Sequence, residues 1–245
     1  MTGATSLQLR DGEVDVWLTS LSDIGPAQEL ACQPLLSEPE RAKWRRFLVP
    51  HARLQYLVTR ALVRTTLSKY ADVPSREWQF ETNGYGRPHV APVHAVQDLR
   101  FNLSNTAGLV ACAVSRDDEI GIDIETIARH VDIDSVAPTV FAPAELADFR
   151  RTPAEDRIER FFSYWTLKEA YIKARGMGLS LPLDGFWFEL GGPSPILHVT
   201  DRCPDIPGRW RFYQYAPTDE HKMAIAVAAP PGIEPSIRLN WTTPV

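Results

Sequence analysis

Residues 119–125 read EIGIDIE, and this heptapeptide decides how the second half of the chain folds. Apolar residues alternate with glycine or acidic residues, which is the period of a β-strand and places the three isoleucines on one face. The opposite face carries Asp123 and Glu125, whose Cα atoms lie about 6.6 Å apart in an extended chain. The sequence therefore predicts a strand with one apolar face and one face of neighbouring carboxylates.

Asp123 and Glu125 are neighbouring carboxylates, and their negative charges repel each other. Two ionised carboxylates that approach to ~4 Å repel by about 4 kcal/mol at the effective dielectric of a partly buried site. A cation between them turns that cost into a ligand set, and oxygen donors without nearby histidine or cysteine favour Mg²⁺, with Mn²⁺ as the alternative, over zinc. A solvated polar strand face is the other interpretation, and the heptapeptide alone leaves both open.

Residues 155–175 predict a long helix, ended by Gly176 in the position that favours a left-handed cap. Its apolar stripe continues at four-residue steps into Glu169 and Lys173; the apolar members are Ile158, Phe161, Phe162 and Trp165. A carboxylate on the buried face of a helix needs a partner. Glu169 and Lys173 can form a surface pair with each other. The aromatic neighbours instead favour a cleft, with Glu169 as a third oxygen ligand.

A basic block lies in the first half of the chain. Residues 41–64 contain seven basic residues and no acidic one. On a helix predicted over residues 51–69, three of its arginines (Arg53, Arg60 and Arg64) fall within about 40° of one another at the flank of the apolar face. Such a row can hold phosphates, although a solvated helix face explains it equally well. The turn GYGRP at residues 84–88 adds Arg87, but it matches neither a dinucleotide fingerprint nor a P-loop.

Composition and charge exclude several classes of protein. The 245 residues include 26 basic and 31 acidic side chains, a net charge of −5, which argues against nucleic-acid and membrane-surface partners. No apolar run approaches 18 residues, and the N-terminus lacks a signal-peptide pattern, so we expect a cytoplasmic protein. The three cysteines are far apart and predict neither a disulfide framework nor a zinc site.

The two halves of the chain show the same order of elements: a strand, a long helix, then further strands. Strands are predicted around residues 14–18, as two runs within 101–114, and as short runs around 186–190, 195–199, 209–215 and 223–229. This order suits either two similar α+β lobes or a single α+β domain. The residues together predict a metal-dependent site for a phosphorylated substrate, and they leave the reaction open between phosphoryl or phosphodiester transfer and simple ligand binding.

The pair GIDIE (residues 121–125) and WTLKEAYIK (residues 165–173) resembles the signature of the Sfp-type 4′-phosphopantetheinyl transferases. GRP at 86–88, FNLS at 101–104 and GLSLPL at 178–183 extend the likeness over roughly residues 37–190. The resemblance implies an α+β monomer of two similar lobes related by pseudo-twofold symmetry, with the active site between them. Residues 1–118 would form the coenzyme A-binding lobe, and residues 119–245 the lobe with the metal site and catalytic helix.

The resemblance also implies the reaction. Such enzymes transfer the 4′-phosphopantetheine arm of coenzyme A to a serine hydroxyl of an acyl or peptidyl carrier protein, in secondary metabolism or fatty-acid-type synthesis, and release adenosine 3′,5′-bisphosphate. By position, Asp123, Glu125 and Glu169 resemble the Mg²⁺ ligands, and Glu169 also the acceptor of the serine proton. Lys173 resembles the cation on the pyrophosphate. The coenzyme A contacts would be Arg60, Arg87, Ser104 and Asn105, together with Lys173.

Asn105 departs from the family pattern, which usually has histidine there. Asparagine offers only neutral hydrogen bonds, so we expect weaker dependence on the 3′-phosphate of coenzyme A than in relatives with histidine. Two rival interpretations remain. A degenerate relative would bind coenzyme A or a carrier protein without catalysis. A nucleic-acid-binding module would use residues 41–64 but would leave the three carboxylates without a role.

Overall fold

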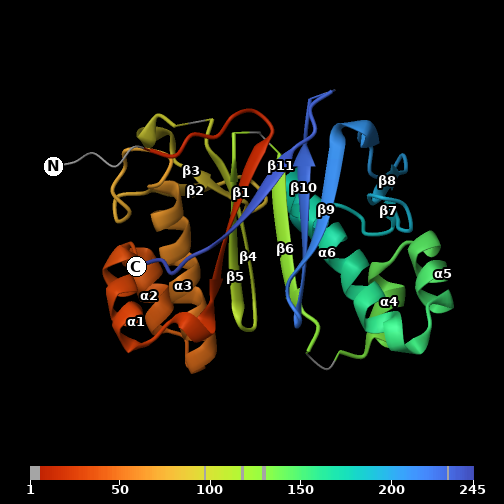
Figure 1. Ribbon diagram of the computed structural model, residues 1–245, viewed down its shortest axis with the longest axis horizontal. Helices are drawn as coiled ribbons and strands as arrows, with labels where there is room; N and C mark the ends of the chain where they lie inside the picture. Colours follow the sequence, from red (N-terminus) through yellow and green to blue (C-terminus); the bar gives the residue numbers. More distant parts are fainter. Residues whose placement is uncertain (1–5, 97, 117–118, 129–130, 231) are drawn as a thin grey trace. The chain divides into compact units, whose positions relative to one another are not determined.

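The computed structural model describes residues 6–96, 98–116, 119–128, 131–230 and 232–245. The chain divides into two compact units, each built of helices and sheets (Figure 1). Unit 1 comprises residues 1–82, 88–118 and 236–245, and unit 2 comprises residues 83–87 and 119–235. The predicted mixture of helices and sheets is confirmed, whereas the pseudo-twofold symmetry and the placement of a site between lobes stay predictions.

Unit 1 is built on a four-stranded sheet in the order β11-β1-β5-β4. β1 runs antiparallel to β5 and parallel to β11. Helix α3 packs against β5, and its buried residues Val58, Leu62 and Val63 join the core of this unit. The elements are β1 (Glu13–Ser20), α1 (Pro26–Cys32), α2 (Glu38–Arg45), α3 (Pro50–Leu67), β2 (Phe80–Thr82), β3 (Pro88–Val90), β4 (Arg100–Thr106), β5 (Leu109–Ser115) and β11 (Ser236–Trp241).

Unit 2 is built on a three-stranded antiparallel sheet in the order β6-β10-β9, with helix α6 against β6 and β10 (Figure 1). A separate hairpin pairs β7 with β8. Aromatic rings fill the core, among them Phe162, Tyr171 and Phe186. The elements are β6 (Ile120–Thr126), α4 (Ile133–Val140), α5 (Pro143–Arg151), α6 (Arg157–Arg175), β7 (Phe186–Glu189), β8 (Ile196–Val199), β9 (Trp210–Thr218) and β10 (His221–Ala228).

The strand and helix predictions for the two central elements are confirmed. The three isoleucines of β6 are buried on one face of the strand. Helix α6 ends at Gly176, whose φ of 62° is left-handed and whose N–H donates to the carbonyl of Ile172 at 3.0 Å. Ile158 differs from the prediction: it is exposed because it lies in the first turn of α6, none of whose residues is buried. The buried stripe begins at Phe161.

The last ten residues belong to unit 1, although they follow the residues of unit 2 in sequence and the predicted boundary after residue 118 places them in the second lobe. β11 pairs with β1 in parallel, from Glu13 opposite Ser236 to Leu18 opposite Trp241. Thr19 Oγ1 also donates to the carbonyl of Thr242 at 2.8 Å. Among the residues that the structure describes, none of the helices combines the length and apolar character that crossing a membrane requires.

Candidate functional site

Helix α6 lies directly on strand β6, and Gly121 makes this contact possible. A Cβ atom at Gly121 would lie 2.0 Å from the carbonyl oxygen of Ala170 and 2.5 Å from the nitrogen of Ala174. Side chains alternate along a strand, so Asp123 and Glu125 share the face of β6 that points toward α6. The glycine of the sequence motif thus brings the helix onto the carboxylate face of the strand.

The facing row on α6 consists of Trp165, Glu169 and Lys173, spaced at four-residue steps. Lys173 Nζ donates to Asp123 Oδ1 at 2.7 Å and to the carbonyl of Ile122 at 3.1 Å. Trp165 Nε1 donates to Glu125 Oε1 at 3.2 Å. The strand and the helix therefore run in opposite directions along one line of contact.

The lengths of the two elements match along this line. The four residue steps from Gly121 to Glu125 span about 13 Å of extended strand. The nine steps from Ala174 back to Trp165 span about the same length of helix. Each carboxylate on β6 therefore meets a polar side chain on α6.

Glu169 lies in a negative environment. Burial raises the pKa of its carboxyl group, and the charges of Asp123 and Glu125 raise it further, while the ammonium of Lys173 partly opposes them. Asp123 is only 5% exposed, and Glu125 is half-buried. Three carboxylates thus share this contact with one lysine, and a divalent cation would relieve their mutual repulsion.

The metal role itself stays a prediction. Within the described residues, no three Asp, Glu, His or Cys side chains converge closely enough to form a complete metal-ligand cluster. The ammonium of Lys173 lies against Asp123 instead. The donor set still fits a hard cation, because all three candidate ligands are carboxylates and the charges of Asp123 and Glu125 help to raise the pKa of Glu169.

Arg87 holds the ends of the same two elements together. Its guanidinium donates to the carbonyl of Ala174 at 2.6 Å and to the carbonyl of Ile120 at 3.0 Å. Asn83 Nδ2 donates to the carbonyl of Gly176 at 2.9 Å. The predicted contact of Arg87 with coenzyme A stays a prediction, and the structure adds a role in fixing α6 against β6.

Three other residues predicted to contact coenzyme A lie in unit 1. Arg60, on α3, has its Nη1 atom 3.8 Å from Glu40 Oε1. Ser104, on β4, is buried, whereas Asn105 is exposed and its Oδ1 accepts a hydrogen bond from Gln55 Nε2 at 2.5 Å. The side-chain amide of Asn105 is thus oriented by α3.

The arginine row predicted on α3 is wrong for Arg64. This side chain is 1% exposed, forms an ion pair with Glu40 at 2.7 Å, and donates to the carbonyl of Trp78 at 2.7 Å. Arg53 lies over the ring of Trp44 at 4.1 Å. Helical spacing could not show this, because α2 packs against α3 and supplies Glu40 from just outside the acid-free block.

The sequence did not predict two contacts near the row on α6. One is the hydrogen bond from Trp165 to Glu125, because the sequence pattern predicts only an apolar contact for the tryptophan ring. The other is an ion pair between Lys168 and Glu145 at 2.7 Å, in which both side chains are fully buried. Lys168 also donates to the carbonyl of Phe186 at 3.0 Å, which ties the residue before Glu169 to α5 and β7.

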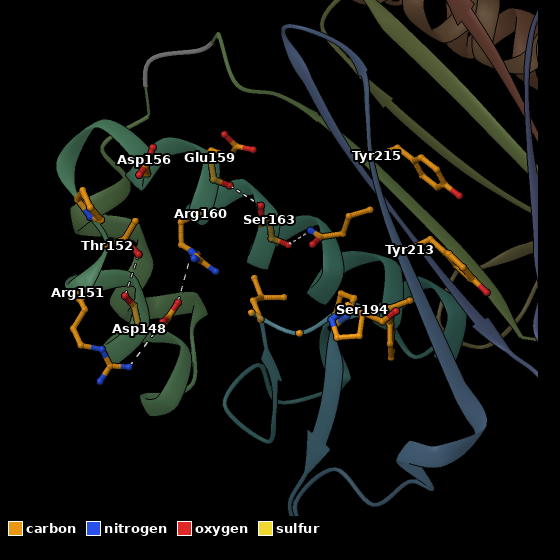
Figure 2. A pocket seen from close by; sticks show the side chains of 18 residues that line it. Asp148, Arg151, Thr152, Asp156, Glu159, Arg160, Ser163, Ser194, Tyr213 and Tyr215 are labelled. Carbon is orange, nitrogen blue, oxygen red and sulfur yellow. Dashed lines mark hydrogen bonds and ion pairs between the residues drawn. The ribbon is translucent and has the colours of Figure 1, made fainter.

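A cavity of about 770 Å³ lies elsewhere in unit 2, between α5, the start of α6, the turn of the β7–β8 hairpin and β9. Figure 2 shows Arg160 and Asp148 on one side of it and Tyr213 and Tyr215 on β9. Among the described residues that line it, none is a predicted catalytic, metal or coenzyme A residue. The α6–β6 row is therefore the candidate site, not this cavity.

Comparisons with known proteins identify the family of the chain. A family model described as the 4′-phosphopantetheinyl transferase superfamily matches residues 119–227, and one described as 4′-phosphopantetheinyl transferase, N-terminal, matches residues 26–117. The 4′-phosphopantetheinyl transferase HetI of Nostoc sp. is 33% identical over 224 residues, 91% of each chain. The 4′-phosphopantetheinyl transferase Sfp of Bacillus subtilis is 30% identical over 195 residues, 80% of this chain and 83% of that protein.

Proposed function

Because this chain belongs to the Sfp-type 4′-phosphopantetheinyl transferases, enzymes that transfer phosphopantetheine to carrier proteins, we propose that its donor is coenzyme A and its acceptor a serine hydroxyl of an acyl or peptidyl carrier protein. The products would be the modified carrier and adenosine 3′,5′-bisphosphate. The observation that carries the proposal is the α6–β6 contact, which aligns Asp123, Glu125, Glu169 and Lys173 along one line.

Mg²⁺ is the proposed cofactor, with Asp123, Glu125 and Glu169 as the residues that would hold it. When bound, the cation supplies positive charge to the pyrophosphate of coenzyme A. The raised pKa of Glu169, which burial and its acidic neighbours cause, supports a cation at this place. Mn²⁺ has the same preference for carboxylate oxygens and would replace it.

Glu169 is the proposed proton acceptor. The serine oxygen forms a bond to the phosphorus on the pantetheine side of the pyrophosphate, the bond to the adenosine bisphosphate breaks, and the serine proton passes to Glu169 directly or through water. Glu169 lies at the centre of the row on α6, between Trp165 and Lys173.

Lys173 is the proposed cation for the leaving group. Its ammonium would stabilise the charge that develops on the departing phosphate. In this structure the ammonium contacts Asp123. A substrate pyrophosphate would therefore compete with Asp123 for Lys173, while Mg²⁺ would compete with Lys173 for Asp123.

The remaining contacts with coenzyme A are proposed for Arg60, Arg87, Ser104 and Asn105. The neutral amide of Asn105, which accepts a hydrogen bond from Gln55, supports a weak interaction with the 3′-phosphate. A monomeric state, a cytoplasmic location and the absence of nucleic-acid and membrane partners remain predictions, which light scattering, fractionation and binding assays would check.

The experiment is to incubate the protein with coenzyme A, Mg²⁺ and an apo carrier protein and to measure the carrier by mass spectrometry. We expect the carrier to gain the mass of the phosphopantetheine arm, and the gain to stop when EDTA removes the metal. Binding of coenzyme A without any mass gain across a panel of apo carriers would instead indicate a degenerate relative.

A further inference from the structure

Trp165 provides a polar contact within an otherwise apolar stretch of α6. Its indole Nε1 donates to Glu125 Oε1 at 3.2 Å. Its ring lies parallel to that of Phe161, with centroids 6.5 Å apart and planes 11° apart. The ring is therefore supported on the side of the core, while its N–H points to the carboxylate on β6.

The position of Trp165 links this contact to the proposed site. Trp165 lies four residues before Glu169, one helical turn away in the row on α6. Glu125 follows Asp123 on the same face of β6. The hydrogen bond therefore joins the helix to the strand at the end of the row opposite Lys173. Lys173 holds Asp123 with a charge, whereas Trp165 holds Glu125 with a neutral donor.

We propose that Trp165 is a positioning residue that orients the Glu125 carboxylate for a divalent cation. The proposal rests on the proposed function, because it takes Glu125 to be a metal ligand. A glutamate has several rotatable bonds, and a half-buried carboxylate must be fixed before it can serve as a ligand without an entropic cost. The indole N–H orients one oxygen, and because it is neutral it adds no positive charge beside Glu125.

A neutral donor suits this role because it does not compete with the metal. A lysine or arginine at position 165 would neutralise Glu125 and weaken its attraction for the cation. Hydrogen-bond partners of metal ligands typically contribute 10–100-fold to metal affinity. We therefore expect the Trp165 N–H to affect metal affinity more than the stability of the fold.

The test compares Trp165→Phe, which keeps an aromatic ring and removes the N–H, with the matched control Trp187→Phe. Trp187 lies in β7, stacks on His198 with ring centroids 4.9 Å apart, and is not part of the row. Mn²⁺ affinity is measured by electron paramagnetic resonance on metal-stripped protein with saturating coenzyme A and no carrier. We expect Mn²⁺ to bind about 10–100-fold more weakly to Trp165→Phe and unchanged to Trp187→Phe.

A double-mutant cycle with Glu125→Ala shows whether Trp165 acts through Glu125. If it does, Trp165→Phe costs no further Mn²⁺ affinity in that background. A Trp165→His variant restores an N–H donor and should recover part of the affinity, while thermal unfolding verifies that each variant is folded. Unchanged affinity in Trp165→Phe, or an equal loss in both backgrounds, overturns the positioning role alone. A wild-type protein that binds no Mn²⁺ overturns the proposed metal site and this inference with it.

Discussion

Replacing Gly121 with alanine tests whether the contact between α6 and β6 builds the site. The new Cβ would lie 2.0 Å from the carbonyl oxygen of Ala170 and 2.5 Å from the nitrogen of Ala174. Both are main-chain atoms of a helix, so no flexible side chain can move aside. A Cβ atom needs at least about 3 Å from such atoms, because carbon contacts closer than this are strongly repulsive. The helix must therefore retreat from the strand by about 1 Å.

The size of the effect follows from that displacement. Overpacking of a core costs about 1–3 kcal/mol, and we expect Gly121→Ala to lie near the upper limit because the obstacle is backbone. At about 2–4 °C per kcal/mol for a chain of this length, Tm should fall by about 6–12 °C. A misplacement of about 1 Å between Glu169 and Asp123 should also lower kcat/KM by about 10²-fold.

The assay combines thermal unfolding with transfer kinetics at a temperature where the variant is still folded. Gly208→Ala is the matched control, because a Cβ at Gly208 would meet no atom within 4 Å. We expect this control to stay within about 0.5 kcal/mol of the wild type. A Gly121→Ala variant that keeps the Tm and the kcat/KM of the control would show that this close contact does not build the site.

Three further predictions address the buried ion pair, the stability of the fold at low pH, and the preference for coenzyme A over dephospho-coenzyme A. Lys168→Met leaves the fully buried Glu145 without its cation and should lower the free energy of unfolding, measured in urea, by about 3–5 kcal/mol. The control Lys222→Met loses only the ion pair with the exposed Glu159 and should lower it by less than about 1 kcal/mol. Equal losses in the two variants would contradict the prediction. Burial would raise the pKa of Asp205, but hydrogen bonds and nearby positive charge outweigh it and lower that pKa below its unfolded value of about 3.9. This stability is present above the unfolded pKa and is lost as pH falls through the lower folded pKa, so the wild type should lose stability more steeply than Asp205→Asn below about pH 4, and parallel acid limbs would refute it. Asn105→His should increase the preference for coenzyme A over dephospho-coenzyme A about tenfold by adding a charge-assisted hydrogen bond, a change that an unaltered ratio of kcat/KM values would rule out.

Local periodicity was enough to predict β6 and α6. The alternation at residues 119–125 depends only on which side chains are apolar, and the left-handed cap at Gly176 depends only on the absence of a Cβ atom. These two elements carry all four residues of the candidate catalytic row. The row could therefore be predicted from the sequence as a set of residues, although its contacts could not.

Contacts between distant segments were beyond the sequence. The pairing of β11 with β1 joins residues more than 220 positions apart, and no local pattern encodes that partner. Arg64 looked like part of a surface row because its burial depends on Glu40, which another helix supplies. The ring of Trp165 fits the predicted apolar stripe, and only the position of β6 shows that its N–H contacts Glu125.

The most direct test of the central claim is the mass of an apo carrier protein after incubation with coenzyme A, Mg²⁺ and either the wild type or Glu169→Gln. Glutamine keeps the size of the side chain, but it has no negative charge to attract the cation and cannot accept the serine proton. We predict that the wild type adds the phosphopantetheine arm and that Glu169→Gln adds none at equal concentration and time. A carrier left at its apo mass by the wild type, or modified at the full rate by Glu169→Gln, would contradict the account.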